Sequence, residues 1–283
     1  GQMPRLLGLA QASKIYRNVK GIDTTNFSDN GNEVAWGTIG NASTSEGLFF
    51  ETINAAGVLQ VPMIISIWDD EYGISVHARH QTTKENISEI LKGFQRDKNN
   101  KGYEILRVNG WNYPELIDTY QRAAQLSRKE HIPVMIHVQE LTQPQGHSTS
   151  GSHERYKSQE RLDWETEYDC NAQMRQWVID NNIATDEEFE NIKNILHKNG
   201  KAYFDSVFEE HQLDGFLSIN NYHAGYAAVA EYPALTVPMG FEENGAPKGL
   251  TFISYPLQEK QLLEWAYAYE QASKARKSPE KYK

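Results

Sequence analysis

Two polar segments, each placed after a strand-like run, contain the residues of this sequence that are best suited to chemistry. The first, residues 40–47, reads Gly-Asn-Ala-Ser-Thr-Ser-Glu-Gly and follows a short predicted strand at 33–39. The second, Trp-Asp-Asp-Glu-Tyr-Gly-Ile-Ser at 68–75, follows an apolar run at 61–67. Parallel strands joined by one crossover place their carboxyl ends at the same edge of a sheet. We therefore expect the oxygen-bearing side chains of the two segments to lie close together.

The chemistry predicted for this edge is the binding of a metal ion and a diphosphate. The first segment is predicted to turn into a helix, and the free N–H groups of a helix N-terminus attract phosphate. Gly40 and Ala42 are small and allow the backbone to approach a ligand closely. Mg²⁺ prefers hard oxygen ligands, which Asn41, Asp70 and the carbonyl of Tyr72 offer. The alternative is that Asn and Asp stand at these strand ends only for their turn-forming chemistry.

The elements that must position these residues alternate between helix and strand. The run at 61–67 is rich in β-branched residues, which is typical of a strand buried on both faces. A strand-helix-strand unit implies a right-handed crossover, so we predict an α/β fold with an open, mostly parallel sheet and helices on both faces. Thr44 or Ser45 is predicted to cap the helix after the first strand. The other predicted elements are helices at 5–18, 87–94 and 114–128 and strands at 104–108 and 133–139.

Composition excludes several classes of function. The net charge of −10 argues against unassisted binding to nucleic acid or to an anionic membrane. No apolar run approaches the roughly 20 residues that span a bilayer. The single cysteine, Cys170, excludes an internal disulfide, and we expect an intracellular, cytoplasmic protein. The opening Gly1-Gln2-Met3 suggests that the N-terminus of a longer protein is missing.

Residues 1–195 resemble the α-type portion of the thiamine diphosphate-dependent E1 component of 2-oxo acid dehydrogenases, most of all the branched-chain (2-oxoisovalerate) type. The resemblance rests on five runs in family order, at 2–10, 40–47, 51–56, 72–75 and 146–156. It implies a thiamine diphosphate-binding fold with Mg²⁺. The cofactor-binding positions that it implies are Gly40, Asn41, Ala42, Ser43, Asp70, Tyr72 and Ile74.

The sequence departs from the family at both metal ligands. The family has an acidic residue after the first glycine and an asparagine about thirty positions later, where this chain has Asn41 and Asp70. The amide and the acid have exchanged places, so the charge offered to the ion is the same. The resemblance implies Asn41, Asp70 and Tyr72 as metal ligands, with Asp70 as the main anionic one.

The segment at 141–158 is a long loop without hydrophobic periodicity, and such loops are usually functional or mobile. By resemblance, His147 lies near the cofactor and helps to position the 2-oxo acid or the lipoyl group; the alternative is an exposed loop histidine. Ser148 and Ser150 are possible phosphorylation sites by resemblance. His153 is expected to be exposed, whereas His77 follows the segment that faces the cofactor.

Residues 200–283 resemble the C-terminal end of amidase-signature enzymes and are predicted to form a small α/β segment. The resemblance rests on the runs at 213–215, 230–240, 249–252 and 262–272. The serine-rich region that carries the family's Ser-Ser-Lys triad is not in this sequence, so Ser218 and Ser254 are read as strand or turn serines. Without its partners the segment is expected to expose strand edges, and either to add to the first sheet or to be poorly packed. The predicted elements are helices at 204–212 and 258–274 and strands at 213–219, 233–239 and 248–254.

The resemblance implies oxidative decarboxylation of a branched-chain 2-oxo acid, followed by acyl transfer to a lipoyl carrier. The implied partners are an E1 β portion and a lipoyl-bearing acyltransferase, in an oligomer. The glutamate that activates the cofactor comes from the β portion in this family, so the chain alone is predicted to be inactive. The alternatives are an amidase-type hydrolase and a non-catalytic assembly module.

Overall fold

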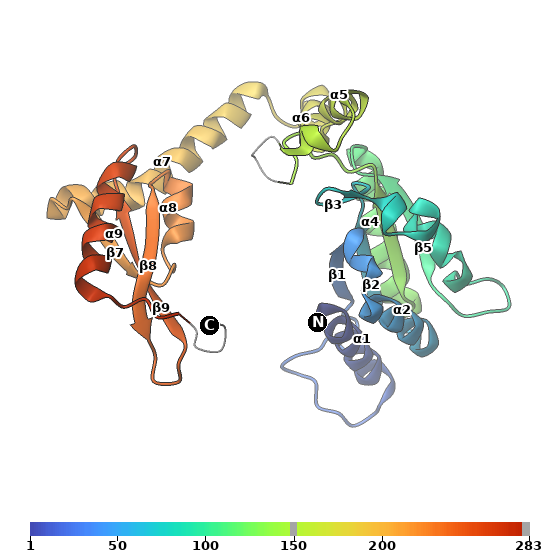
Figure 1. The fold of residues 1–283 in the computed structure, drawn as a ribbon. Helices are drawn as coiled ribbons and strands as arrows, with labels where there is room; N and C mark the ends of the chain where they lie inside the picture. The colour runs from blue at the N-terminus through green and yellow to red at the C-terminus, as the bar shows by residue number, and fades with distance from the viewer. Residues whose placement is uncertain (148–151, 279–283) are drawn as a thin grey trace. The chain divides into compact units, whose positions relative to one another are not determined.

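The computed structural model describes residues 1–147 and 152–278 of the chain. They form two compact units, residues Gly1–Ile183 and Ala184–Lys283, and each is described by itself (Figure 1). None of the described helices is long and apolar enough to span a membrane.

The first unit is built on a four-stranded parallel sheet, which confirms the predicted fold class. In spatial order the strands are β1 (Ala35–Gly40), β2 (Met63–Trp68), β6 (Val134–Gln139) and β5 (Glu104–Asn109). The two central strands, β2 and β6, are buried along almost their whole length, as expected from their continuous apolar sequences. Gly40 is the register partner of Trp68, and Trp68 is the register partner of Val138. The carboxyl ends of these three strands therefore lie at one edge of the sheet.

Helices cover both faces of this sheet. They are α1 (Gln2–Asn18), α2 (Gly47–Leu59), α3 (Ile87–Ile90) and α4 (Tyr113–Glu130). Two further helices, α5 (Gln159–Glu167) and α6 (Cys170–Asp180), come after β6 in the chain. The chain moves across the sheet from β1 to β2 to β5 and then turns back to β6. Right-handed crossovers place helices on opposite faces when the direction reverses. Ile65 accordingly packs with α1 and α2, whereas its neighbour Ile64 packs with α4.

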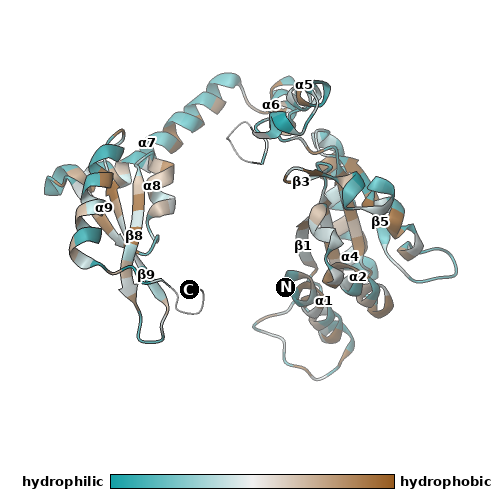
Figure 2. Ribbon diagram, in the orientation of Figure 1, coloured by the Kyte–Doolittle hydropathy of each residue, from teal (hydrophilic) through white to brown (hydrophobic). Residues whose placement is uncertain are grey.

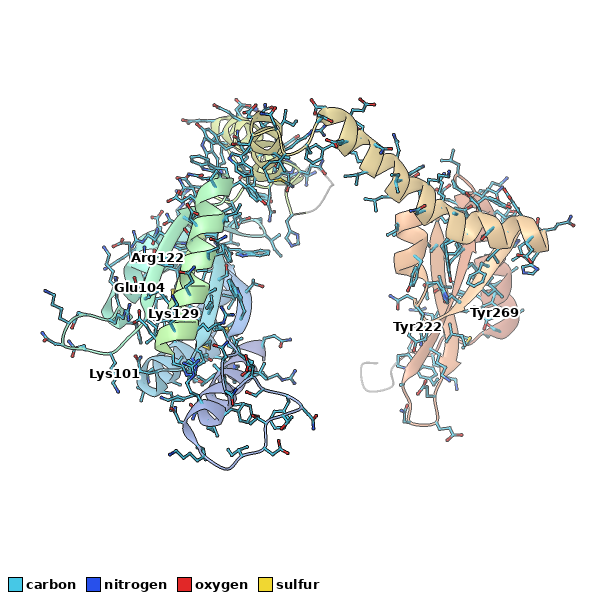
Figure 3. The ribbon with its side chains drawn as sticks, turned by 180° about the vertical axis from the view of Figure 1, so that it is seen from behind. Lys101, Glu104, Arg122, Lys129, Tyr222 and Tyr269 are labelled. Atoms are coloured by element: carbon cyan, nitrogen blue, oxygen red, sulfur yellow. The ribbon has the colours of Figure 1, made fainter. Side chains whose placement is uncertain are left out.

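The amino edge of the sheet, opposite the strand ends of interest, carries a cluster of partly exposed charges. Glu104 at the start of β5 accepts hydrogen bonds from Arg96 (2.9 Å) and from Arg122 of α4 (3.1 Å). Figure 3 shows Glu104 and Arg122 on neighbouring elements. Ion pairs of this kind at the surface contribute little to stability.

The second unit has a sheet and a core of its own. Its elements are α7 (Asp186–His211), β7 (Gly215–Ile219), α8 (Ala224–Ala230), β8 (Ala234–Phe241), β9 (Pro247–Ser254) and α9 (Glu259–Ser273). The antiparallel sheet has the order β7-β9-β8. Phe204 and Phe208 of α7 pack on one face with Tyr232, and Leu262 of α9 packs on the other. The expectation that this segment would add to the first sheet or be poorly packed is therefore wrong for the described residues.

Helix α7 runs without interruption through the region where the two resemblances were expected to join. It begins with a capping box, in which Thr185 and Glu188 satisfy each other's backbone N–H groups, and it ends at His211. Its second half supplies core residues to the second unit, and contacts divide the chain between Ile183 and Ala184. Figure 2 shows hydrophilic residues along α5, α6 and the first half of α7 and apolar residues on the strands.

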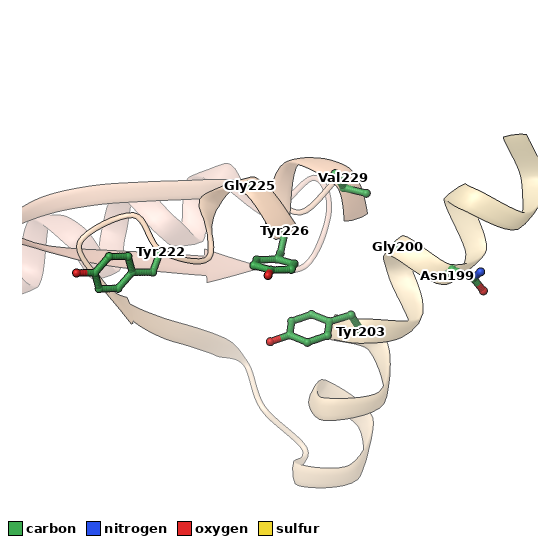
Figure 4. Close-up of a pocket in the computed structure, with 7 residues that line it drawn as sticks. All are labelled: Asn199, Gly200, Tyr203, Tyr222, Gly225, Tyr226 and Val229. Carbon is green, nitrogen blue, oxygen red and sulfur yellow. The ribbon is translucent and has the colours of Figure 1, made fainter. Parts of the chain in front are cut away.

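An apolar pocket of about 590 Å³ lies between α7 and α8 in the second unit (Figure 4). Its lining includes Tyr203 and Tyr226, whose rings stack with centroids 5.5 Å apart, and Val229. On β7, Leu217 and Ile219 remain 57% and 53% exposed. The second unit thus keeps a well-packed core beneath a surface that is unusually apolar in places.

Candidate functional site

Asn41 and the turn at 69–72 meet at the carboxyl edge of the parallel sheet. The N–H of Asn41, directly after β1, donates to the carbonyl of Trp68 at the end of β2 (2.9 Å). The N–H of Asp69 donates in turn to the carbonyl of Val138 in β6 (2.9 Å). The parallel ladder therefore brings the two polar segments together, 28 residues apart in sequence when counted from Asn41 to Asp69.

The segment after β1 passes through a 3₁₀ turn (Ala42–Ser45) before α2 begins. The hydroxyl of Thr44 donates to the carbonyl of Asn41 (2.6 Å), and that of Ser45 donates to the carbonyl of Gln81 (3.3 Å). Neither hydroxyl is free to cap α2, whose N-cap is Glu46 without a side-chain hydrogen bond. The prediction of a Thr44 or Ser45 cap is therefore wrong.

The predicted cofactor positions around Asn41 differ in exposure. Asn41 is buried, and its side-chain amide makes no hydrogen bond within the described part of the chain. A Cβ atom at Gly40 would meet nothing within 4 Å, so there is open space beside this backbone. Ala42 is half-buried and Ser43 is exposed. An open, small-residue backbone next to an uncommitted amide oxygen is suited to contact with a ligand.

The turn after β2 is shaped by its own carboxylates. Asp69 Oδ1 accepts the N–H of Glu71 (2.8 Å), and Asp70 Oδ1 accepts the N–H of Tyr72 (3.1 Å). Glu71 has a φ of +65°, in the left-handed region that non-glycine residues rarely adopt. Burial raises the pKa of the Asp70 carboxyl, although the Tyr72 N–H and the charge of Lys157 oppose the shift. A divalent cation beside Asp70 would favour the ionised form.

Tyr72 and Ile74 belong to a small hairpin made of β3 (Tyr72–Gly73) and β4 (Val76–His77). The rings of Tyr72 and His77 meet edge to face with centroids 5.0 Å apart. A Cβ atom on Gly73 would be 2.7 Å from the Cβ of Ala42, so only glycine allows the hairpin to pack against the 3₁₀ turn. Ile74 is exposed and has a φ of +59°, a strained conformation for a β-branched residue.

A buried chain of polar side chains supports this turn from inside the sheet, and the sequence did not reveal it. His137 Nε2 lies 2.8 Å from Asp69 Oδ2, and His137 Nδ1 lies 2.8 Å from the hydroxyl of Ser88 in α3. Ser88 also donates to the side-chain oxygen of Asn86, the N-cap of α3. His137 and Ser88 are fully buried. The only signal in the sequence was a histidine inside an otherwise apolar strand.

Replacing His137 with phenylalanine is expected to destabilise the first unit by about 2–4 kcal/mol, because the buried Asp69 carboxylate loses a hydrogen-bond partner. Thermal and urea unfolding followed by circular dichroism measures the loss. Replacing His131, which is half-buried and contacts the carbonyl of Gly31, serves as a comparison away from the site. A His137→Phe variant as stable as wild type would show that the chain of polar contacts does not support the turn.

A second network, also not predicted, covers the turn from outside and comes from α5. Arg161 contacts the carbonyl of Asp70 (3.1 Å between Nη2 and O) and forms an ion pair with Glu71. Its Nε donates to Glu165 (2.8 Å), which also binds the ammonium of Lys157 (2.7 and 2.8 Å). Arg161 is 91 residues from Asp70 in sequence, a separation at which local patterns carry no information.

The loop at 141–158 is described only in part. His147 is exposed at the end of the first described stretch. Ser148 and Ser150, the possible phosphorylation sites, lie outside the described residues. His153 is only 8% exposed, so the expectation that it would be exposed is wrong. Its ring packs against Gly146, where the φ of +67° and the lack of a Cβ make room for it.

The oxygen donors at this edge fit a hard divalent cation. Among the described residues no group of three or more His, Cys, Asp and Glu side chains could hold a metal ion by itself. One carboxylate, one amide and one backbone carbonyl are nevertheless the kind of partial ligand set that Mg²⁺ uses when water and phosphate complete its coordination. The open space at Gly40 and the uncommitted amide of Asn41 agree with such a group.

The fold and this edge define the class of protein: an α/β protein with an oxygen-donor site at the carboxyl ends of parallel strands, where such sheets bind ligands. Residues 1–214 match the family described as "Dehydrogenase E1 component". Because this match covers most of the chain, the chain belongs to the dehydrogenase E1 component family, and its similarities are to α-type 2-oxo acid dehydrogenase subunits. Enzymes of this family depend on thiamine diphosphate, normally with a divalent metal ion.

Individual relatives are distant. The chain is 24% identical over 162 residues to "Pyruvate dehydrogenase E1 component subunit alpha" of Rickettsia bellii (strain RML369-C), covering 57% of this chain and 47% of that protein. It is 26% identical over 162 residues to "2-oxoisovalerate dehydrogenase subunit alpha 1, mitochondrial" of Arabidopsis thaliana, covering 56% of this chain and 32% of that protein. The chain thus spans about half or less of the length of these relatives.

A second similarity is to an amidase, as the sequence indicated. The chain is 33% identical over 84 residues to "Probable amidase At4g34880" of Arabidopsis thaliana, covering 30% of this chain and 16% of that protein. In the second unit, Ser218 lies in β7 and Ser254 in β9, and both are buried. The hydroxyl of Ser218 contacts His223 Nδ1 at 2.8 Å, an interaction within the fold of that unit.

Proposed function

We propose that this chain is the α-type portion of a 2-oxo acid dehydrogenase E1 component and that it binds thiamine diphosphate with Mg²⁺ at the carboxyl edge of its parallel sheet. Asp70 is the main anionic ligand of the ion, and Asn41 and the carbonyl of Tyr72 complete the protein's share of the coordination. The proposal is supported above all by one observation. The ladder between β1 and β2 brings Asn41 next to the Asp70 turn in a chain whose residues 1–214 match the E1 family.

The chain's own residues bind and orient the cofactor. Gly40, Ala42 and Ser43 present their backbone N–H groups to the diphosphate, and there is open space beside Gly40 to accept it. Ile74 projects from the strained tip of the hairpin toward solvent and offers an apolar surface to the cofactor. Bound thiamine diphosphate supplies the carbanion chemistry that decarboxylates the 2-oxo acid. The buried contacts of Asp69 with His137 keep the metal-binding turn in one conformation.

For the complete reaction we propose a branched-chain 2-oxo acid as substrate and acyl transfer to a lipoyl-bearing acyltransferase. The similarity to a 2-oxoisovalerate dehydrogenase subunit supports the branched-chain substrate, and the similarity to a pyruvate dehydrogenase subunit makes pyruvate the competing candidate. An E1 β portion completes the active site in an oligomer. His147 assists in positioning the 2-oxo acid or the lipoyl group from the loop at 141–158.

Calorimetric titration of thiamine diphosphate into the chain, in the presence of Mg²⁺, tests the binding site directly. Binding is expected with Mg²⁺ and not in excess EDTA, because the diphosphate and Asp70 share the ion. Thiamine without its diphosphate is the matched control. No heat of binding with thiamine diphosphate and any divalent ion would overturn the proposed function. The chain alone is expected not to decarboxylate 2-oxoisovalerate or pyruvate, and turnover comparable to that of a complete enzyme would contradict its dependence on a β portion.

A further inference from the structure

Arg161 of α5 contacts the last three residues of the turn at 69–72, which include the proposed metal ligands Asp70 and Tyr72. Its Nη2 donates to the carbonyl of Asp70 at 3.1 Å, and its Nη1 pairs with the carboxylate of Glu71. Its guanidinium carbon lies 5.7 Å from the ring centroid of Tyr72. One side chain thus binds the backbone of the first residue, the charge of the second and the ring of the third.

The position of Arg161 is itself fixed by buried partners. Its Nε donates to Glu165, one turn along α5, at 2.8 Å. Glu165 is fully buried and is held from the other side by Lys157, whose ammonium lies 5.1 Å from the ring centroid of Tyr72. The guanidinium also stacks over Trp164 at 4.8 Å. Because Glu165 and Trp164 already hold its guanidinium, Arg161 loses little further entropy when it contacts the turn.

The turn needs such support because its conformation is unfavourable by itself. Glu71 has a φ of +65°, in the left-handed region that is strained for a residue other than glycine. Residues that orient metal ligands without touching the metal typically change metal affinity by about 10–100-fold when they are mutated. Arg161 has the contacts expected of such a residue.

We propose that Arg161 is a positioning residue of the metal site: it fixes the turn at 70–72 so that the oxygens of Asp70 and Tyr72 face the end of β1. The expected effect of Arg161 on metal affinity rests on the proposed function. Its expected effect on the conformation of the turn does not depend on a bound ligand. Lysine cannot replace arginine here, because an ammonium group cannot bind Asp70, Glu71 and Glu165 in three fixed directions.

The test compares Arg161→Lys and Arg161→Gln with a matched control, Arg96→Lys, in the full chain. Arg96 also forks between two carboxylates, Glu104 at 2.9 Å and Glu130 at 2.5 Å, but at the amino edge of the sheet. Two quantities are measured for each variant. One is the apparent affinity for Mg²⁺ at fixed thiamine diphosphate, by calorimetry. The other is hydrogen exchange, by NMR, at the amides of Glu71 and Tyr72.

Both Arg161 variants are expected to bind Mg²⁺ about 10–100-fold more weakly and to exchange the amides of Glu71 and Tyr72 at least about tenfold faster, whereas Arg96→Lys changes neither. A role of Arg161 in general stability alone would speed exchange throughout β2 and β6 as well. Unchanged exchange at these two amides overturns the proposal. If wild type fails to bind thiamine diphosphate, the proposed function is overturned, and the exchange measurement still decides the role of Arg161.

Discussion

Replacing Asp70 with alanine is expected to weaken the binding of Mg²⁺ and thiamine diphosphate by more than about a hundredfold. Asp70 is the only carboxylate among the three proposed ligands, and a ligand in direct contact with the ion matters more than the outer residues whose loss lowers affinity by about 10–100-fold. Asn41 and the Tyr72 carbonyl would remain, but neither carries a charge. Calorimetric titration of the cofactor into the variant at fixed Mg²⁺ measures the effect.

Asp97→Ala is the matched control, because Asp97 is exposed in the loop before β5 and its carboxylate accepts hydrogen bonds only from residues of that loop among the described residues. It should bind the cofactor as wild type does. An Asp70→Ala variant with unchanged affinity would show that Asp70 does not replace the acidic ligand that the family has at the position of Asn41. The exchange of acid and amide would then have no role in metal binding.

The same carboxyl should make the cofactor-free protein less stable at neutral pH. Burial raises the pKa of Asp70 in the folded state above its ordinary value, so the folded protein binds this proton more tightly than the unfolded one. The free energy of unfolding therefore falls as the pH rises from the ordinary aspartate pKa through the raised one. Asp70→Asn keeps the acceptor for the Tyr72 N–H and removes the charge. Its melting temperature should exceed that of wild type at pH 7, and the difference should vanish near pH 3.

The juxtaposition of Asn41 and Asp70 was predictable because it follows from local patterns. The β-branched run before Trp68 and the helix between the two strands together require a parallel pair, and a parallel pair places residues that follow each strand at one edge. The contacts that give the turn its shape were not predictable. Asp69 meets His137 across 68 residues and Asp70 meets Arg161 across 91, and no periodicity in the sequence relates them.

In the second unit, too, some elements and contacts could not be predicted from the sequence. Its strands were expected from turn residues and apolar runs, but α8 was not, because Ala224–Ala230 has almost no polar residue to reveal a helical period. Its stability depends on Phe204 and Phe208, which α7 delivers from a helix that begins 18 residues before the first of them. The sequence predicted the part of this helix at 204–212, which contains both phenylalanines, but not its continuity with the residues from Asp186 onward.

Replacing Glu165 with glutamine is expected to destabilise the first unit by about 3–5 kcal/mol, the range seen when one partner of a buried ion pair is removed. Glu165 is fully buried and neutralises both Lys157, whose side chain is 2% exposed, and Arg161. The amide keeps the volume of the carboxylate but not its charge, so the Lys157 ammonium is left buried without compensation. Urea unfolding of the variant, with Glu160→Gln on the exposed side of α5 as the control, measures the loss.

A Lys157→Met substitution in the Glu165→Gln background should recover much of this stability, because it removes the uncompensated charge and leaves an apolar side chain of similar length. The recovery would separate stability from function. The double variant regains its stability while Arg161 lacks the charged partner that orients it, so the affinity for Mg²⁺ should remain reduced. A double variant that recovers both properties would mean that the contacts of Arg161 with Asp70 and Glu71 position the turn without help from Glu165. A Glu165→Gln variant that unfolds like wild type would mean that the buried charges of Lys157 and Glu165 do not stabilise this unit.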